Sequence, residues 1–523
     1  MNARDEEAGC SYVFDPDEWE ASHGTSSELN EKELDDGCWH CPHPAAEGHE
    51  YCLFHSPPAE TDASRVAAAF LEQIATVGNR PKQFIGARFE RLELEHAILE
   101  SNDNYPIDLR HARIHGELDW RYAIVRQPLN FGGALFEGAT RFDETTFAGD
   151  AFFSAAVFDT ESKAYVLEAV FEKAAIFYDV AFPGDTSFFS AQFAGRTDFI
   201  ENRFESVNFR EAEFDWRARF KEATFEHAEF HGSTFRDGAD FRSAVLPESL
   251  GFRNASFDGP VRFREPETTA ETCRVDLRRS HVTAGTLAQA SDESVVYDLQ
   301  GATVGDVKPE DTERNDWFGY LHILNTTFDG FDFGMFRDQL VAANWRLHDR
   351  SGGDSGDDGD SPANGQLENT YLKAKNGANE IGDAQAAAEF FRKEMTFRRY
   401  QYVTQMREGE SVHQRARAAW QWTANALLDI TSGYGERPSR VIVFSAAVIV
   451  LFAALFAVAW PVGPYGGGIG YLLLSLESFI TLVLGGGVAV NDPFVRLLAE
   501  VEGFVGAFLI ALFVFTLTRS IHR

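Results

Sequence analysis

Large apolar residues recur every five or six positions through much of the first half of the chain. The series begins at Phe84, Phe89, Leu94 and Leu99, is irregular over 101–128, and then restarts. Its later members are Phe131, Phe136, Phe177, Phe182, Phe188, Phe193, Phe199, Phe204, Phe209, Phe214, Phe220, Phe225, Phe230, Phe235, Phe241, Leu246, Phe252, Phe257 and Phe263. A helix repeats about every 3.6 residues and a half-buried strand alternates, so neither element explains this spacing. A fixed period of this kind indicates an internal structural repeat.

The segment EAEFDWRARFKEATFEHAEFHGSTF (211–235) follows the pattern A-x-F/L-x-x and resembles the pentapeptide-repeat family. The resemblance extends over residues 81–265. It implies a right-handed, quadrilateral β-helix with the central Phe or Leu of each unit inside. Four units would form a turn of about 20 residues, and about nine turns would give a rod about 43 Å long. The six-residue steps predict a bulge at one corner.

Beyond the repeats the pattern changes several times. Residues 266–348 retain short strand-like runs, so we expect an irregular continuation of the β-structure followed by a helix at 337–348. Residues 349–366 are rich in Gly, Asp and Ser and predict a flexible acidic linker. Helical periodicity returns over 367–436, with a break at Gly377–Gly382, Asp383 as the cap of a second helix, and a third helix over 411–430.

Two apolar stretches near the C-terminus are long enough to span a membrane. VIVFSAAVIVLFAALFAVAW (441–460) has 20 uncharged residues, and GFVGAFLIALFVFTL (503–517) is the second. Arginines precede the first stretch and follow the second, so the positive-inside rule places the soluble domains and the C-terminus in the cytoplasm of a multi-pass cell-membrane protein. YLLLSLESFITLVL (471–484) is too short to cross and predicts a re-entrant helix.

The order span, re-entrant helix, glycine loop, span resembles two-helix potassium-type channels. The resemblance rests on SFITLVLGGG (478–487), on Pro493 and on the apolar helix at 496–519. It implies a homotetramer that passes monovalent cations, with a pore loop containing Thr481, Gly485, Gly486 and Gly487. Val483 and Leu484 stand where the family has Thr-Val, and Gly486 stands at the aromatic position. A cation pore and a non-conducting, membrane-tethered scaffold are therefore both open hypotheses.

A more familiar filter-like string, TSGYGE, occurs at 431–436. The residues before it are rich in Lys, Arg and Glu and contain no membrane span, whereas a filter needs a membrane helix on each side. We therefore predict that Gly433 and Gly435 end the preceding helix and turn the chain into the first span.

Clustered cysteines near the N-terminus indicate a metal site. Cys38-x2-Cys41 and Cys52-x2-His55 can place three thiolates and one imidazole around a structural Zn2+. Cys10 is a possible alternative ligand, and the neighbouring histidines His40, His43 and His49 also leave the ligand set open. The first residues lack the features of a signal peptide, and clustered cysteines in a cytoplasmic segment more often bind metal than form disulfides. Cys273 stands alone and predicts a small packed side chain.

The amino-acid composition then narrows the range of possible partners and functions. Asp and Glu outnumber Lys and Arg 81 to 47, giving a formal net charge of −34. This excess makes nucleic acid an unlikely partner and resembles the acidic, solvated surfaces of proteins from salt-loving microbes. Arginines interleave with the acids of the repeats, so the rod reads as a scaffold whose protein partner is unknown and whose charged residues face solvent.

The predicted organisation is multidomain: a zinc-knuckle-like segment (1–60), a helix or linker (61–80), the repeat solenoid (81–265), its irregular continuation (266–348), the acidic linker (349–366), a helical connector (367–436) and a two-span membrane domain with a re-entrant pore loop (437–523). No nucleophile, acid/base pair or phosphate loop stands out, so we do not expect an enzyme.

Overall fold

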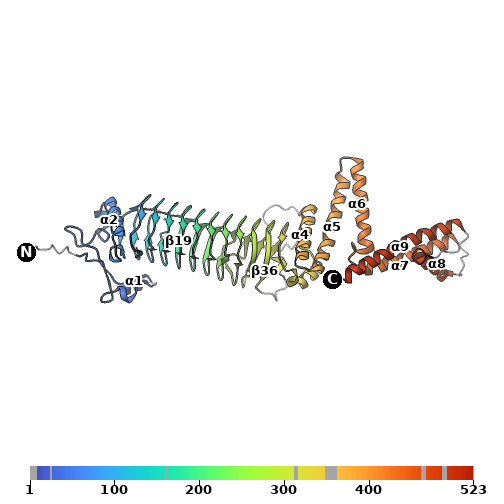
Figure 1. The fold of residues 1–523 in the computed structure, drawn as a ribbon, viewed down its shortest axis with the longest axis horizontal. Coiled ribbons are helices and arrows are strands. Elements are labelled where there is room, and N and C mark those ends of the chain that lie inside the picture. Colours follow the sequence, from blue (N-terminus) through green and yellow to red (C-terminus); the bar gives the residue numbers. More distant parts are fainter. Residues whose placement is uncertain are drawn as a thin grey trace, which may run out of the picture. The chain divides into compact units, whose positions relative to one another are not determined.

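The computed structural model describes residues 9–23, 26–159, 163–291, 293–310, 316–347, 362–460, 467–485 and 492–521. The chain forms two compact units, Met1–Asp354 and Ser355–Arg523. The first unit is mostly β-structure, and the second unit is helical (Figure 1).

A β-solenoid of about 11 turns makes up most of the first unit. Its strands run from β3 (Arg88–Phe89) to β38 (Thr327–Phe328) and belong to two sheets of 19 and 17 strands. Pairing is parallel between successive turns, as between β20 (Gln192–Phe193) and β23 (Glu213–Phe214). Many strands contain only two residues; the longest are β19 (Ala181–Ser187), β22 (Arg203–Asn208), β25 (Thr224–Glu229), β33 (Thr272–Asp276), β34 (His281–Leu287), β35 (Ser294–Asp298) and β36 (Thr303–Pro309).

The turns are longer and more numerous than the repeat pattern predicted. Phe193 pairs with Phe214, 21 residues further on, and Ile98 pairs with Ile124, 26 residues further on. The β-structure also continues through the region after 265, as expected. The inner positions there are filled by other apolar side chains, such as Val275, so the Phe period ends before the solenoid does.

The six-residue steps have a local structural cause. Where the six-residue step from Phe182 lies beside a five-residue step of the next turn, the pairing register shifts between Phe182 and Asp185, which is the predicted irregularity. The step after Phe193 contains Gly195, where a Cβ would lie 2.3 Å from the backbone of Lys173 in the preceding turn. Only glycine lets the two turns approach so closely.

Columns of phenylalanine rings fill the solenoid. The rings of Phe193 and Phe214 stack with centroids 4.8 Å apart, and the column continues from Phe214 to Phe235 at 4.9 Å. Neighbouring columns meet edge to face, as Phe209 and Phe220 do at 5.6 Å. Both arrangements suit the ring quadrupole, so the interior combines apolar burial with favourable aromatic contacts.

Short apolar elements cover both ends of the solenoid. At the N-terminal end, α2 (Ala63–Ala75) buries Phe70, whose ring lies 4.5 Å from that of Phe84. At the C-terminal end, η5 (Phe333–Phe336) and α3 (Arg337–Ala342) follow the last strand, and Phe333 packs 4.9 Å from Phe328. Such caps shield the apolar interior and the unpaired strand edges that a solenoid would otherwise expose.

Six aspartates of the solenoid are buried rather than solvent-facing, which corrects the interpretation from the sequence for these residues. They belong to two rows: Asp108, Asp198 and Asp240 lie in the 19-stranded sheet, and Asp119, Asp276 and Asp298 lie in the 17-stranded sheet. A typical member, Asp276, accepts the N–H of Arg278 at 3.2 Å and bonds its guanidinium at 2.8 Å. This Asp-x-Arg pattern, shared by Asp108, Asp119 and Asp240, closes the corner through a side-chain turn.

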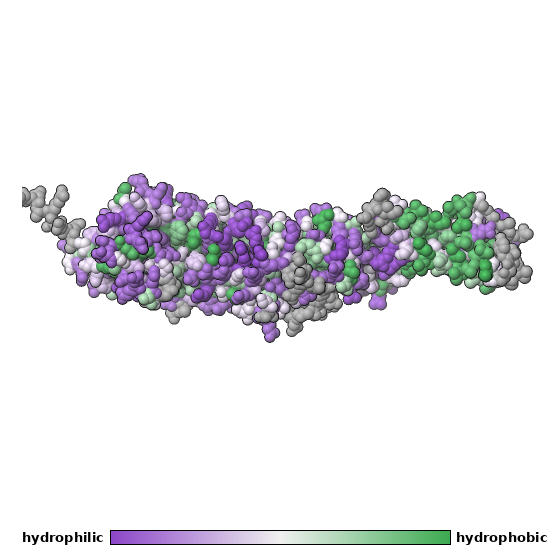
Figure 2. Space-filling view, turned by 90° about the horizontal axis from the view of Figure 1, so that it is seen from below, coloured by the Kyte–Doolittle hydropathy of each residue, from purple (hydrophilic) through white to green (hydrophobic). Residues whose placement is uncertain are grey.

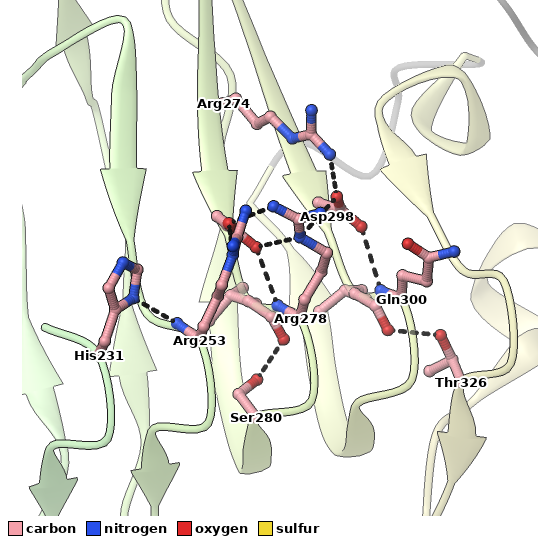
Figure 3. A network of polar contacts seen from close by, with 11 residues as sticks. His231, Arg253, Arg274, Arg278, Ser280, Asp298, Gln300 and Thr326 are labelled. Carbon is pink, nitrogen blue, oxygen red and sulfur yellow. Dashed lines mark hydrogen bonds and ion pairs between the residues drawn. The ribbon is translucent and has the colours of Figure 1, made fainter. Parts of the chain in front are cut away.

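Adjacent corners are joined into a network of polar contacts (Figure 3). Arg253 bonds Asp276 of the next turn at 2.5 Å, and Arg274 bonds Asp298 of the turn after that. The Arg253 N–H donates to His231 at 3.0 Å. Charge pairing between turns therefore accompanies the aromatic columns and satisfies the buried carboxylates.

The second unit begins with α4 (Asn364–Glu380), α5 (Ala384–Glu408) and α6 (Val412–Ser432). Asp383 caps α5 as predicted, whereas α4 continues through Gly377 because the break falls at 381–383. Three further helices follow: α7 (Pro438–Ala459), α8 (Gly467–Leu484) and α9 (Pro493–Ile521). The predicted acidic linker lies outside the described residues over 349–361.

Candidate metal centre and candidate membrane helices

The candidate metal centre is assembled by one short antiparallel pairing and one turn. Strand β1 (Val13–Phe14) pairs with β2 (Trp39–His40), and the adjoining Cys10 N–H donates to the His43 carbonyl at 3.0 Å. This pairing brings the first cysteine of the chain beside Cys41. The turn that starts at Cys52 then presents His55.

Four potential ligands converge at this point: Cys10, Cys41, Cys52 and His55, whose ligand atoms all lie within 4.8 Å of one another. The Sγ atoms of Cys41 and Cys52 are 3.8 Å apart, and Cys52 Sγ is 3.1 Å from His55 Nδ1. Tetrahedral zinc with Zn–S bonds of about 2.3 Å separates its sulfur ligands by about 3.8 Å. All the described cysteines are free thiols, so the cluster is no disulfide.

The surroundings orient these ligands. His55 Nε2 lies 3.0 Å from the Ile85 carbonyl, which can only accept, so Nε2 carries the hydrogen and Nδ1 presents its lone pair to the sulfurs. The Cys52 N–H donates to Cys10 Sγ at 3.2 Å. Tyr12 stacks on the His55 ring at 3.9 Å. The donor set and these supporting contacts fit a structural Zn2+.

Hydrogen bonds among the three thiols shift their pKa values in opposite directions. Hydrogen bonds from Cys41 and Cys52 lower the pKa of the Cys10 thiol. The hydrogen bond to Cys10 is the largest cause that raises the pKa of Cys41, and likewise raises the pKa of Cys52 to about 12. Three neighbouring thiolates therefore require positive charge, which a bound metal ion supplies.

Cys38 lies outside this group, although the sequence placed it in the ligand set. It closes a tight turn with Asp35, with backbone hydrogen bonds of 2.8 and 3.0 Å, and remains partly exposed. Cys10, the alternative, takes the fourth place. Among the spare histidines, His43 bonds the Gln83 carbonyl at 2.9 Å and stacks on Phe84.

Distant Cys273 is buried, and burial raises the pKa of its thiol to about 12, consistent with the small packed side chain expected from the sequence.

The metal segment is attached to the first turn of the solenoid. Besides the bond from His55 to Ile85, the Phe54 carbonyl accepts the Arg88 N–H at 2.8 Å. The Phe54 ring lies 4.9 Å from Phe84. A metal ion bound here would consequently stabilise the end of the solenoid as well as the knuckle.

Two helices of the second unit are long and apolar enough to cross a membrane: Pro438–Ala459 and Pro493–Arg519. Only 17% and 28% of their most apolar windows are buried, whereas the core helix of a soluble protein is mostly buried. Their outward side chains form a continuous apolar surface (Figure 2). Its members include Ile442, Val443, Val450, Leu451, Val458, Phe504, Phe508 and Phe515.

The shorter apolar helix α8 packs against both α7 and α9. Phe479 of α8 shares a buried cluster with Val441 and Leu509. Thr481 lies in its last turn, where its hydroxyl bonds the Glu477 carbonyl. Gly485 ends the helix with a positive φ of 72°. The other two glycines of the predicted pore loop, Gly486 and Gly487, lie outside the described residues.

The TSGYGE string is a helix corner, as predicted. Helix α6 ends at Ser432, and Gly433 follows in the left-handed region at φ 56°. Tyr434 donates to Asn425 at 2.8 Å. The Glu436 carboxylate is buried and pairs with Arg519, near the end of α9, at 2.8 Å. These contacts fix the connection between α6 and the first apolar helix.

Comparison with known proteins supports the repeat part of the chain. A family profile described as pentapeptide repeats (9 copies) matches residues 220–265. Searches of curated proteins and of solved structures returned no significant match. Residues 220–265 thus match the pentapeptide-repeat family, and the chain also carries two candidate membrane helices.

Proposed function

We propose that the second unit forms a cation-conducting pore in a homotetramer, anchored in the cell membrane with the repeat solenoid in the cytoplasm. The observation that carries this proposal is the arrangement of α7 and α9 with the shorter α8 packed against both of them and a glycine at its end. Outward apolar surfaces suit lipid, and a short helix packed against two longer ones can enter a membrane without crossing it.

The charges that flank the apolar helices support the proposed orientation. Arg437 precedes α7, Arg440 lies in the first turn of α7, and Arg519 lies in the last turn of α9. By the positive-inside rule both ends face the cytoplasm, together with the N-terminal unit. Attachment of a maleimide–polyethylene glycol to single cysteines placed before and after the spans, in sealed cells and in lysed cells, tests this topology.

Ion flux from liposomes tests conduction. We expect the reconstituted protein to pass K+ and Na+ with weak selectivity, because Val483 and Leu484 replace the threonine-containing pattern of a potassium filter. Gly485→Val should abolish flux, since its positive φ resists a β-branched side chain. Gly468→Ala is the matched control, because a Cβ there meets nothing within 4 Å.

A non-conducting, membrane-tethered scaffold is the second candidate. The same departures from the filter pattern that predict weak selectivity favour it. Flux at background level over a range of voltage, pH and divalent ions, from protein shown to be inserted, would support this alternative. A mass measurement in detergent that finds only monomers would also contradict the pore, because one chain contributes only one loop.

We also propose that Cys10, Cys41, Cys52 and His55 bind a structural Zn2+. Elemental analysis of purified variants tests the ligand set. Cys10→Ser and Cys52→Ser should each lose bound zinc, whereas Cys38→Ser, the matched control, should keep it. Retention of zinc by Cys10→Ser together with loss by Cys38→Ser would instead support the ligand set given by spacing alone.

A further inference from the structure

Glu502 is a carboxylic acid enclosed among three apolar helices. It lies in α9, and its exposed fraction is 0%. The neighbouring Gly503 and Gly506 bring α9 into backbone contact with α8: a Cβ at Gly506 would lie 2.1 Å from the Phe479 carbonyl, and one at Gly503 would lie 3.1 Å from the Ser478 carbonyl. Small residues of this kind permit close helix packing, so Glu502 is held in a tight seam.

Hydrogen-bond accounting at Ser475 indicates how Glu502 is protonated. Ser475 Oγ lies 2.8 Å from the Ile449 carbonyl of α7 and within hydrogen-bond distance of Glu502 Oε1. A hydroxyl has one hydrogen, and a carbonyl oxygen can only accept. If the carboxyl group were ionised, one of these two contacts would have no hydrogen.

If Glu502 carries one proton, both contacts of Ser475 have a hydrogen. The Glu502 O–H then donates to Ser475 Oγ, and the Ser475 O–H donates to the Ile449 carbonyl. The second carboxyl oxygen, Oε2, is buried and has no hydrogen-bond partner among the described residues. An uncharged carbonyl oxygen tolerates that position far better than a carboxylate oxygen does.

The charged groups on the surrounding helices do not compensate an ionised Glu502. Arg440 of α7 pairs with Asp429 at 2.9 Å, outside the seam. Glu477, the acid of α8, is exposed. On α9 itself, Arg496 pairs with Glu500 at 3.0 Å and Arg519 pairs with Glu436.

Tyr471 of α8 donates to the Trp460 carbonyl at 2.8 Å. Within the described residues, therefore, no ion pair offsets a charge on Glu502.

We propose that Glu502, Ser475 and the Ile449 carbonyl form a proton-binding site that locks α8 to α7 and α9. The proton is bound at neutral pH and is released to solvent at alkaline pH. The carboxylate left behind is buried without a cation, so α8 loosens from α9. Because α8 ends at Gly485, proton binding controls the helix that leads into the glycine loop. This inference depends on the packing of the three helices and not on conduction.

Infrared spectroscopy of the full-length protein in lipid nanodiscs tests the bound proton. The carbonyl stretch of a protonated carboxylic acid should be present at neutral pH and disappear in Glu502→Gln. Glu477→Gln, which removes the exposed acid of the same helix bundle, should leave the band unchanged. Identical neutral-pH spectra for the wild type and Glu502→Gln would show an ionised Glu502 and overturn the proposal.

Ser475→Ala separates the proposed hydrogen bond from a simple packing role. Without the Ser475 acceptor, the acid band should move to higher frequency, whereas an unshifted band would contradict the geometry. Coupling to α8 is tested by hydrogen–deuterium exchange of residues 471–485 at matched alkaline pH. The wild type should exchange faster than Glu502→Gln, and equal exchange would overturn the proposed locking. Neither measurement requires ion flux, so failure of the pore and failure of this site are distinguishable.

Discussion

At the residue scale, Lys82 is a buried cation that joins three segments at the N-terminal end of the solenoid. Its side chain is fully buried, and its ammonium donates to the carbonyls of Thr76 and Gly78 and to the carboxylate of Asp103, at 2.7, 3.0 and 3.0 Å. Burial would raise the pKa of Asp103, but the N–H groups of Gly78 and Tyr105 and the Lys82 ammonium outweigh it and lower the pKa to about 2.

Lys82→Met should lower the free energy of unfolding by about 3 kcal/mol at neutral pH, because it leaves a largely buried carboxylate without its cation. The loss should shrink as the pH falls. In the unfolded chain Asp103 gains a proton near pH 4, whereas in the folded wild type it stays ionised down to about pH 2. The stability supplied by the pair is therefore present above about pH 4 and lost as the pH falls through about 2.

Chemical unfolding of the full-length protein in detergent at several pH values measures this effect. Lys163→Met is the control, because Lys163 and its partner Asp185 are both exposed and 3.6 Å apart. An equal loss of stability at pH 7 and near pH 2 in Lys82→Met would contradict the role assigned to the pair.

The sequence was least informative about which individual residues make up the candidate metal site. The spacing of Cys41, Cys52 and His55 marks a metal site directly, but the fourth ligand depends on strand pairing. Cys10 lies 31 residues before Cys41 and reaches it only because β1 pairs with β2. Cys38 has favourable spacing and is nevertheless held in a turn. The spacing of residues along the sequence cannot reveal a contact that depends on the antiparallel pairing of two strands.

At the element scale, the aromatic columns determine how each turn is stabilised by its neighbours. Phe214 is fully buried, stacks on Phe193 and Phe235, and meets Phe209 and Phe220. Its removal therefore affects three successive turns. In a solenoid each turn contacts chiefly its neighbours, so a local defect weakens two interfaces at once.

Phe214→Ala should lower the free energy of unfolding by about 4 kcal/mol, because it removes a buried ring and leaves a cavity. Phe214→Leu should cost about 1 kcal/mol, since Leu occupies equivalent positions such as Leu94 and Leu246. Denaturant unfolding followed by circular dichroism measures both. Trp216→Ala, at a residue that is 61% exposed, is the control, and a larger effect there than at Phe214 would contradict the column model.

A helix or strand could be predicted from the sequence where one type of side chain recurred along it. The Phe period gave the solenoid and its inner positions, and the uncharged runs gave α7 and most of α9. The last turns were harder to count because Cys273, Val282 and Tyr297 replace phenylalanine inside. An inner position requires apolar volume rather than one residue type. The solenoid therefore continues beyond the segment in which phenylalanine recurs. Four of the six buried corner aspartates, Asp108, Asp119, Asp240 and Asp276, do have a signature, Asp-x-Arg, that a search for apolar periods overlooks.

At the scale of the whole molecule, the excess of acidic groups opposes folding. The formal net charge is −34, and the acidic side chains repel one another across the surface. Ion pairs such as that of Arg236 with Glu213, at 3.0 Å, offset part of this repulsion. Salt shortens the Debye length from about 10 Å at 0.1 M to about 3 Å at 1 M. Net repulsion acts over longer distances than these contact pairs, so screening should weaken repulsion more than it weakens pairing.

We therefore expect the protein to be more stable at high salt. A gain of about 2 kcal/mol between 0.1 M and 1 M KCl would raise the unfolding midpoint by about 2–3 °C, because the unfolding entropy is about 2.1 cal/mol/K per residue and the first unit has roughly 350 residues. Differential scanning fluorimetry in detergent measures the shift. Sucrose at matched osmolality is the control, because an uncharged osmolyte favours compact states without screening charge. A midpoint that falls with KCl would mean that the inter-turn ion pairs outweigh the repulsion, and a midpoint that rises equally with sucrose would exclude screening as the cause.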